Sequence, residues 1–240
     1  MTVEEFIEAS LGAKTVDELF GIYQKAMSQL GYDRLIFSLM TDHLSIGRKA
    51  GHGIISNYPD DWMKYYVEKN FAPLDPVRGG MFATVGPLLW DDMETSQPLT
   101  RQQARFMSEG REAGLFKGVG IPLRGVLGAI AGIGAASSNS QIDTDLVTLS
   151  KLNLISQQFY TVFLALEGGF SHTENIRLSD REREILQWSA NGQTRKQIAN
   201  TLGISPSTVD VHANSILKKF KTGNMTVAAF RAVNMYLIQL

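Results

Sequence analysis

Closely spaced helix start signals in residues 178–240 constrain this part of the chain more than any other feature. Two capping boxes, Ser179-x-x-Glu182 and Thr194-x-x-Gln197, follow one another there. In each, the hydroxyl can accept from the backbone of the first helical turn, while the longer side chain accepts from the backbone of the capping residue. Each box marks the start of a helix, and the two boxes are only 15 positions apart. The pattern therefore predicts short helices in tandem.

The second of these helices is expected to end at Gly203, a residue type that closes helices in the left-handed conformation. Ser205-Pro206 then starts another helix with a capping hydroxyl and a proline at the first position. Two helices joined by a short turn with glycine form the geometry that lays the second helix in a DNA major groove. With a last helix expected over 226–238, the sequence predicts an all-α four-helix helix-turn-helix domain that binds double-stranded DNA.

The helix expected over 206–220 has an inward and an outward face. Apolar residues recur on one side with helical spacing and should face the core; they are Val209, Ala213, Ile216 and Phe220. Hydroxyls at the helix start can hold phosphates, and lysines near its end can neutralise flanking phosphates. The predicted DNA-binding residues are Thr194, Ser205, Ser207, Thr208, Asp210, Val211, Asn214, Lys218 and Lys219. A small helical bundle with solvated charges is the alternative.

Charge and composition bound the remaining possibilities. Residues 178–240 hold 8 Lys/Arg against 4 Asp/Glu, whereas residues 1–166 hold 14 against 18, which suits a nucleic-acid partner for the smaller part. The chain has no cysteine, and its 4 histidines lack ligand spacing, so we expect no metal and no cofactor. An acidic N-terminus and the lack of an apolar run of about 18 residues predict a cytoplasmic protein without membrane contact.

Residues 1–166 mix helical and strand patterns. Thr15 should cap a first helix, further helices are expected at 60–70, 99–113 and 142–166, and strands at 33–40, 52–56, 86–90, 118–123 and 127–135. The pattern predicts an α+β protein whose N-terminal domain, residues 1–166, is an α/β/α sandwich with a mainly antiparallel sheet. Two glycines among polar residues indicate a linker at 167–177, ahead of the DNA-binding domain at 178–240.

Residues 178–240 closely resemble the C-terminal helix-turn-helix of LuxR-type regulators. The resemblance is carried by Leu178, Arg181, Glu182, Leu186, Gly192, Thr194, Ile198, Ala199, Leu202, Ile204, Ser205, Thr208, Val209, His212, Lys219 and Asn224. Family members often carry a basic residue where Asp210 stands here. A carboxylate at that position can accept from cytosine, weaken DNA binding, or lie in solvent as a surface charge; the sequence leaves these three outcomes open.

An aromatic cluster in the N-terminal part decides which kind of regulator this is. Tyr58, Trp62 and Tyr66 are followed by Asp75-Pro76 and Trp90. Such stripes are commonly core, but rings with polar tips around a carboxylate also describe a small-molecule pocket. Their spacing, with Gly118 and Pro122, resembles the acyl-homoserine-lactone sensor domain of the same LuxR-type regulators. The resemblance implies a ligand site formed by Tyr58, Trp62, Tyr66, Asp75, Val77, Trp90 and Gly134.

The resemblance also implies roles for these side chains. The Trp62 N–H would donate to the lactone carbonyl, the Asp75 carboxylate would accept from the ligand amide, and the Tyr58 hydroxyl would donate to the acyl carbonyl. Tyr66 and Trp90 would form walls. We expect Asp75 to lack a donor until ligand binds, so that binding stabilises the domain and through it a homodimer. Expected dimer surfaces are the helix at 142–166 and the last helix, with Val227, Phe230, Val233 and Ile238.

Two residues depart from the family pattern, since Gly134 and Ala131 stand where many members have a hydroxyl on the pocket strand. One hypothesis is a pocket widened for a bulky, branched or aryl acyl group; the other is that small residues let a neighbouring helix approach. The implied protein binds an inverted-repeat DNA site as a dimer, with RNA polymerase as a possible partner. The alternatives are an enzyme using Asp75 as base, although no catalytic triad or nucleophile pattern supports it, an orphan receptor for a non-lactone compound, and a ligand-independent regulator.

Overall fold

The computed structural model describes residues 1–96, 98–139, 142–168 and 176–239. The chain forms two compact units that divide near residue 172. Most of the predicted linker, residues 167–177, lies outside the described residues. Within these ranges no helix combines the length and the apolar character that crossing a membrane requires.

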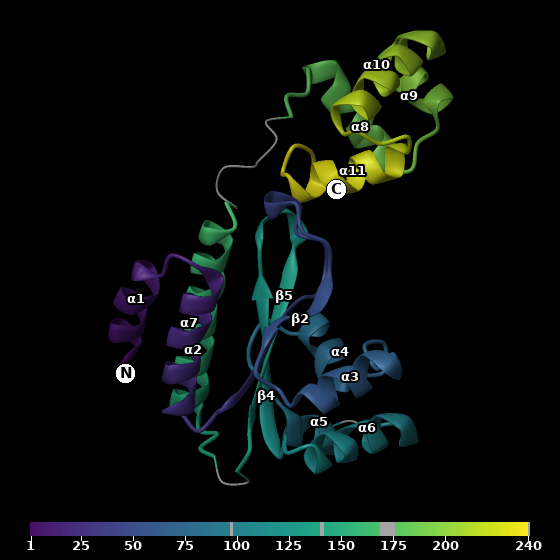
Figure 1. The fold of residues 1–240 in the computed structure, drawn as a ribbon. Coiled ribbons are helices and arrows are strands. Elements are labelled where there is room, and N and C mark those ends of the chain that lie inside the picture. The colour runs from purple at the N-terminus through teal and green to yellow at the C-terminus, as the bar shows by residue number, and fades with distance from the viewer. Residues whose placement is uncertain (97, 140–141, 169–175, 240) are drawn as a thin grey trace. The chain divides into compact units, whose positions relative to one another are not determined.

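An antiparallel sheet divides the N-terminal unit into two helical layers (Figure 1). Its strands are β1 (Arg34–Leu39), β2 (Gly51–Ser56), β3 (Leu88–Leu89), β4 (Lys117–Arg124) and β5 (Ile130–Ser137), in the order β2-β1-β5-β4-β3. On one face lie α1 (Val3–Gly12), α2 (Val16–Ser28) and α7 (Leu146–Leu166). On the other lie α3 (Asp60–Glu68), α4 (Pro76–Ala83), α5 (Trp90–Ser96) and α6 (Arg101–Glu112). The predicted α/β/α sandwich is confirmed.

Alternation along β5 separates the two faces of the sheet. Ala131, Ile133 and Ala135 pack with α1, α2 and α7 in the larger core, whereas Gly132 and Gly134 line a pocket on the opposite face. This follows from the period of two in a strand, in which positions an odd number apart face opposite ways. The expectation that Ala131 belongs to the pocket strand surface beside Gly134 is therefore wrong.

Several element ends differ from those expected from sequence. The strand expected at 86–90 is reduced to Leu88–Leu89, because Trp90 already begins α5. The strand expected at 127–135 lies at Ile130–Ser137, after a 3-10 turn (Val126–Gly128) in which Leu127 has a left-handed φ of 58°. A second 3-10 turn, Leu44–Ile46, precedes β2. The helix expected from 142 begins at Leu146, since the Asp145 carboxylate caps it.

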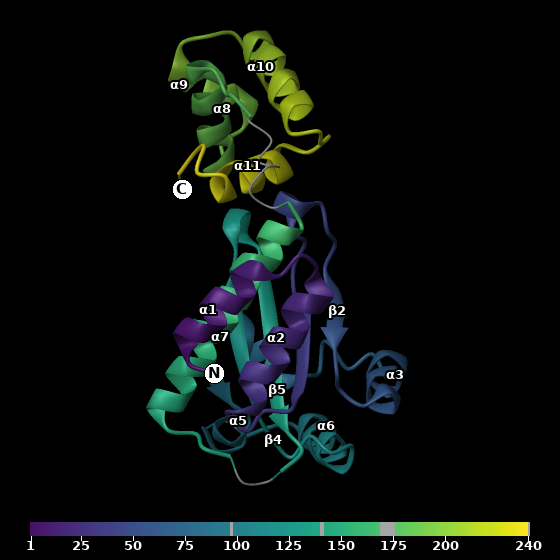
Figure 2. The ribbon, with the colours of Figure 1, turned by 60° about the vertical axis from the view of Figure 1, so that its left-hand side comes forward.

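Within residues 176–239, the C-terminal unit is built from four helices (Figure 2). They are α8 (Asp180–Ala190), α9 (Arg195–Leu202), α10 (Pro206–Lys219) and α11 (Met225–Asn234). Both predicted capping boxes are formed, and Gly203 ends α9 with a φ of 64°. The last helix is shorter than expected, because Tyr236 takes a left-handed φ of 56° just beyond it. The inward face predicted for α10 is confirmed by the burial of Val209, Ala213, Ile216 and Phe220.

Candidate ligand pocket and DNA-binding surface

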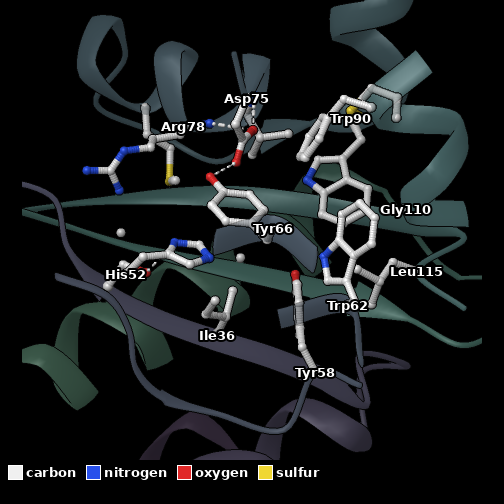
Figure 3. A pocket seen from close by; sticks show the side chains of 17 residues that line it. Ile36, His52, Tyr58, Trp62, Tyr66, Asp75, Arg78, Trp90, Gly110 and Leu115 are labelled. Atoms are coloured by element: carbon white, nitrogen blue, oxygen red, sulfur yellow. Dashed lines mark hydrogen bonds between the residues drawn. The ribbon is translucent and has the colours of Figure 1, made fainter. Parts of the chain in front are cut away.

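A pocket lies between the sheet and the layer of helices α3 to α6 (Figure 3). It brings together all the residues predicted for the ligand site: Tyr58, Trp62, Tyr66, Asp75, Val77, Trp90 and Gly134. The rest of the wall, which no sequence motif indicated, is formed by Ile36, Ser38, His52, Arg78, Met81, Phe106, Met107, Gly110, Leu115 and Gly132. That the seven residues bind a ligand stays a prediction.

The start of α3 supplies the aromatic wall. Trp62 and Tyr66 lie one helical turn apart, so both side chains face the sheet, and each is at most 6% exposed. Tyr58 precedes the helix and is 9% exposed. Burial raises the pKa of the Tyr58 hydroxyl, and the nearby Asp75 carboxylate adds to this effect. The hydroxyl therefore keeps its proton and can act as a hydrogen-bond donor in the pocket.

Two indoles, those of Trp62 and Trp90, line one end of the pocket (Figure 3). In Figure 3 the ring nitrogens of Trp62 and Trp90 both point toward its interior. The Trp90 Nε1 is buried and has no hydrogen-bond partner among the described residues. An unpaired buried N–H is costly, typically about 1–3 kcal/mol. This end of the pocket is therefore suited to a guest that carries hydrogen-bond acceptors.

Asp75 has more partners than expected from sequence. Its Oδ1 accepts from the backbone N–H groups of Val77 and Arg78, at 2.9 and 3.1 Å, so the residue is the N-cap of α4. Its Oδ2 accepts from the Tyr66 hydroxyl at 3.0 Å. The expectation that Asp75 lacks a donor without ligand is wrong. A carboxylate offers about four acceptor positions, so one more N–H can still be accommodated. Burial raises the pKa of Asp75, although these donors and the Arg78 charge oppose that rise.

Glycines on the pocket face of β4 and β5 make room for these side chains. A Cβ at Gly118 would lie 2.5 Å from Cε2 of Trp90. A Cβ at Gly134 would lie 2.9 Å from both the Tyr58 hydroxyl and the Ile36 Cγ2. The space above Gly134 is thus already filled by protein. This argues against a pocket widened at Gly134 for a bulky acyl group. The groups that fill the space belong to β1 and to the segment before α3, whereas the expected neighbour was a helix.

His52 lies at the end of the pocket away from the two indoles (Figure 3). Its imidazole stacks on the Tyr66 ring, with centroids 4.0 Å apart and planes inclined by 7°. Burial lowers its pKa to about 4, and the Arg78 charge contributes. The imidazole is therefore neutral at neutral pH. His52 lies in β2, as the strand expected at 52–56 implies, and the pairing of β2 with β1 brings its side chain to the pocket.

On the C-terminal unit, most of the predicted DNA-binding side chains are accessible. Ser205, Ser207, Asn214 and Lys218 are exposed, and Val211 is 67% exposed. Thr194 and Thr208 are helix-start residues, and the Thr194 hydroxyl caps α9. These positions on α9 and α10 are compatible with contact to DNA, which remains the prediction for them.

Asp210 is not an isolated surface charge. Its carboxylate pairs with the Arg195 guanidinium, with Nη1 and Oδ1 2.6 Å apart. Both side chains are about half exposed, so the pair contributes little to stability. Its effect is to hold a cation from the start of α9 against α10, which offsets the repulsion that a bare carboxylate would exert on phosphate.

Lys219 has a structural partner that the sequence analysis did not foresee. Its Nζ lies 2.6 Å from Oε2 of Glu182 and 2.8 Å from the carbonyl of Arg177. Glu182 is 3% exposed and also accepts from Ser215 at 2.7 Å. Burial alone would raise the pKa of Glu182, but these donors outweigh it and lower the pKa to about 2. Lys219 therefore holds α8 against α10, a role that the sequence pattern did not indicate, and its contact with phosphate stays a prediction.

Comparison with known proteins extends these observations. Residues 15–162 match the model described as autoinducer binding domain, and residues 177–232 match that of bacterial regulatory proteins of the luxR family. The regulatory protein SdiA of Escherichia coli is 30% identical, over 94% of this chain and 92% of its own length. The quorum sensing-dependent transcriptional regulator RpaR of Rhodopseudomonas palustris is 33% identical over 78% of this chain and 75% of its own.

Solved structures agree with this similarity. A crystal structure of Escherichia coli SdiA superimposes with a TM-score of 0.71 at 26% identity, covering 99% of this chain and 98% of that one. A second structure of the same protein, in complex with octanoyl-rac-glycerol, gives the same TM-score at 25% identity and covers 99% of this chain and 96% of that one. The similarity therefore spans both units of the chain.

Proposed function

The chain belongs to the luxR family of bacterial regulatory proteins, and we propose that its pocket binds an N-acyl-homoserine lactone that controls a DNA-bound homodimer. It is an autoinducer-binding transcription regulator with a helix-turn-helix. Its relatives are regulators and not enzymes, which answers the enzyme hypothesis. We place the protein in the cytoplasm, where it can meet both DNA and ligand. RNA polymerase is the proposed partner of the DNA-bound form.

One observation carries the choice of ligand. The pocket combines an acceptor, Asp75, with donors on Tyr58, Trp62 and Trp90, and its wall also carries apolar side chains that include Ile36, Val77, Met81, Phe106 and Leu115. An acyl-homoserine lactone presents the complementary set: one amide N–H, two carbonyl oxygens and a hydrocarbon chain. In the proposed pose, the amide N–H donates to the remaining acceptor position of Asp75, the lactone lies beside the two indoles, and the acyl carbonyl accepts from Tyr58.

Apolar side chains left exposed support the proposed dimer. On α7 these are Leu146, Val147 and Leu154, which are 82%, 62% and 56% exposed. On α11, Phe230 is 69% exposed and Val227 38%. Ile238, expected on the dimer surface, is instead 4% exposed and part of the core of its own unit. A second copy of the chain is the proposed occupant, since a dimer presents two copies of α10 to the two half-sites of an inverted repeat.

The proposal is tested by selecting DNA sites with the purified full chain in the presence of N-octanoyl-homoserine lactone. From a random duplex library we expect an inverted repeat with half-site centres about one helical turn apart, roughly 10 bp. Sedimentation of the complex should give two chains per site. The Trp62→Phe variant keeps the aromatic packing but loses the donor, and its DNA binding should no longer respond to the lactone. Selection of a DNA site with only one half-site would refute the proposal. So would DNA binding that responds to the lactone equally in the wild-type protein and in the Trp62→Phe variant.

A further inference from the structure

The strand β2 is irregular where it passes the pocket. Its pairing with β1 changes register between Phe37 and Leu39, and the additional residues lie on β2. Within them Gly53 takes a left-handed φ of 61°. Such bulges re-aim side chains beside binding sites. Here the bulge includes His52, whose ring lies in the pocket wall (Figure 3).

Neighbouring groups hold the His52 imidazole in one protonation state and one orientation. The Ser38 Oγ accepts from the Gly53 N–H at 3.0 Å and lies 3.4 Å from Nδ1 of His52. Within the described residues, Nδ1 is the one acceptor in reach of the Ser38 O–H, so we assign the hydroxyl as the donor and Nδ1 as the acceptor. A neutral imidazole that accepts at Nδ1 carries its proton at Nε2. Burial and the Arg78 charge keep the ring neutral by lowering its pKa to about 4.

The resulting Nε2–H is a donor without a protein acceptor. Within the described residues, the hydrogen bond with Ser38 is the one that the imidazole makes. The Arg78 guanidinium on this side of the pocket is a donor only, and the apolar Ile36 and Met81 side chains carry no acceptor that could pair with this N–H. An unsubstituted alkyl chain placed here would leave the N–H unpaired and desolvated, which is unfavourable. An oxygen on the chain would pair with it.

The position of this donor fixes where the oxygen belongs. His52 stacks at 4.0 Å on the Tyr66 ring, and the Tyr66 hydroxyl meets Asp75 at 3.0 Å. One phenol ring therefore separates the imidazole from the carboxylate at which the ligand amide is placed. A substituent that reaches Nε2 must lie on the first carbons of the acyl chain, not at the far end of a long one.

Given the lactone pose of the proposed function, we propose that His52 is a specificity-determining residue that selects acyl groups with an oxo or hydroxyl oxygen close to the amide. Ser38 orients the ring through Nδ1. Unsubstituted chains of the same length bind less well because they leave Nε2–H without an acceptor.

The test is a competition on the full chain. The protein is purified with N-octanoyl-homoserine lactone bound and is then equilibrated with equal excess concentrations of this lactone and its 3-oxo or 3-hydroxy counterpart. Mass spectrometry of the retained lactones gives their affinity ratio. The variants are His52→Phe, which keeps the stack on Tyr66 but removes the donor, and Ser38→Ala. The matched control is Gly79→Ala, which lies outside the pocket wall and where a Cβ meets nothing within 4 Å.

We expect the wild-type protein to retain at least one oxygenated lactone about fivefold or more over the octanoyl form, as one net hydrogen bond of about 1 kcal/mol implies. His52→Phe should bring the ratio close to one, Ser38→Ala should lower it partly, and Gly79→Ala should leave it unchanged. If His52→Phe does not fold, the lactone affinity ratios of the wild type and of Ser38→Ala still test the inference. Equal retention by the wild type, or an unchanged ratio in both variants, overturns the inference. Failure to retain any lactone would instead refute the proposed function.

Discussion

A methyl group at Gly118 should displace Trp90 from the pocket. The Cβ of alanine would lie 2.5 Å from Cε2, 2.6 Å from Cζ2 and 2.7 Å from Cδ2 of the indole. Carbon atoms pack at about 3.5–4.0 Å, so the ring must retreat by roughly 1 Å. Gly118 has no left-handed φ, so the effect of the Gly118→Ala substitution is steric and not a backbone effect. Overpacking of this kind costs about 1–3 kcal/mol.

The free energy of unfolding of the N-terminal unit should fall by about 1–3 kcal/mol. The affinity for N-octanoyl-homoserine lactone should fall about tenfold or more, and a tenfold loss corresponds to about 1.4 kcal/mol of binding free energy. Urea denaturation and competition binding measure the two quantities. Gly79→Ala is the matched control, because a Cβ there meets nothing within 4 Å. It should be neutral or slightly stabilising within α4. Wild-type stability and affinity in Gly118→Ala would refute the assigned role of Gly118.

Three further outcomes follow from the structure. Asp75→Asn should keep α4 folded, since asparagine also caps helices, yet lower lactone affinity at least tenfold by presenting an amide donor; unchanged affinity in a competition assay would remove Asp75 from the site. The pKa of His52 is lowered from 6.5 to about 4 in the folded chain, so on acidification the imidazole takes up a proton in the unfolded chain before it does so in the folded one. The free energy of unfolding should therefore fall between pH 6.5 and 4. Urea titrations should show a weaker pH dependence for His52→Phe. Lys218→Ala should lower the slope of log affinity for DNA against log salt concentration by about one. Lys219→Met should instead destabilise the C-terminal unit, because it leaves Glu182 buried without its cation. A reversal of these two effects would contradict the roles given to the two lysines.

Local signals explain why much of the fold could be predicted. The capping boxes at Ser179 and Thr194 and the turn at Gly203 depend on residues only a few positions apart, and all are found in the structure. The pocket aromatics were also predictable, because one helical turn determines that Trp62 and Tyr66 share a face.

Asp75 and Ala131 were misread although the sequence held the needed signals. Asp75 followed by Pro76 is a helix start, with a capping carboxylate and a proline at the first position, so donors from the backbone of α4 are expected at Asp75 even without a ligand. Ala131 and Gly134 are three positions apart in one strand, so they had to face opposite sides of the sheet.

His52 and Lys219 could not have been placed from sequence by local rules. The location of His52 depends on a bulge in the pairing of β2 with β1, which no periodicity within β2 reveals. The partner of Lys219 is Glu182, which lies 37 positions away on another helix. Both are long-range contacts, and only the packing of distant elements determines them.

A crystal structure of the full chain with an N-acyl-homoserine lactone would test the central claim most directly. The account predicts the amide nitrogen of the lactone within hydrogen-bond distance of Asp75, and the lactone ring beside Trp62 and Trp90. A lactone bound elsewhere, or a pocket in which these side chains close on one another while lactone is in excess, would contradict it.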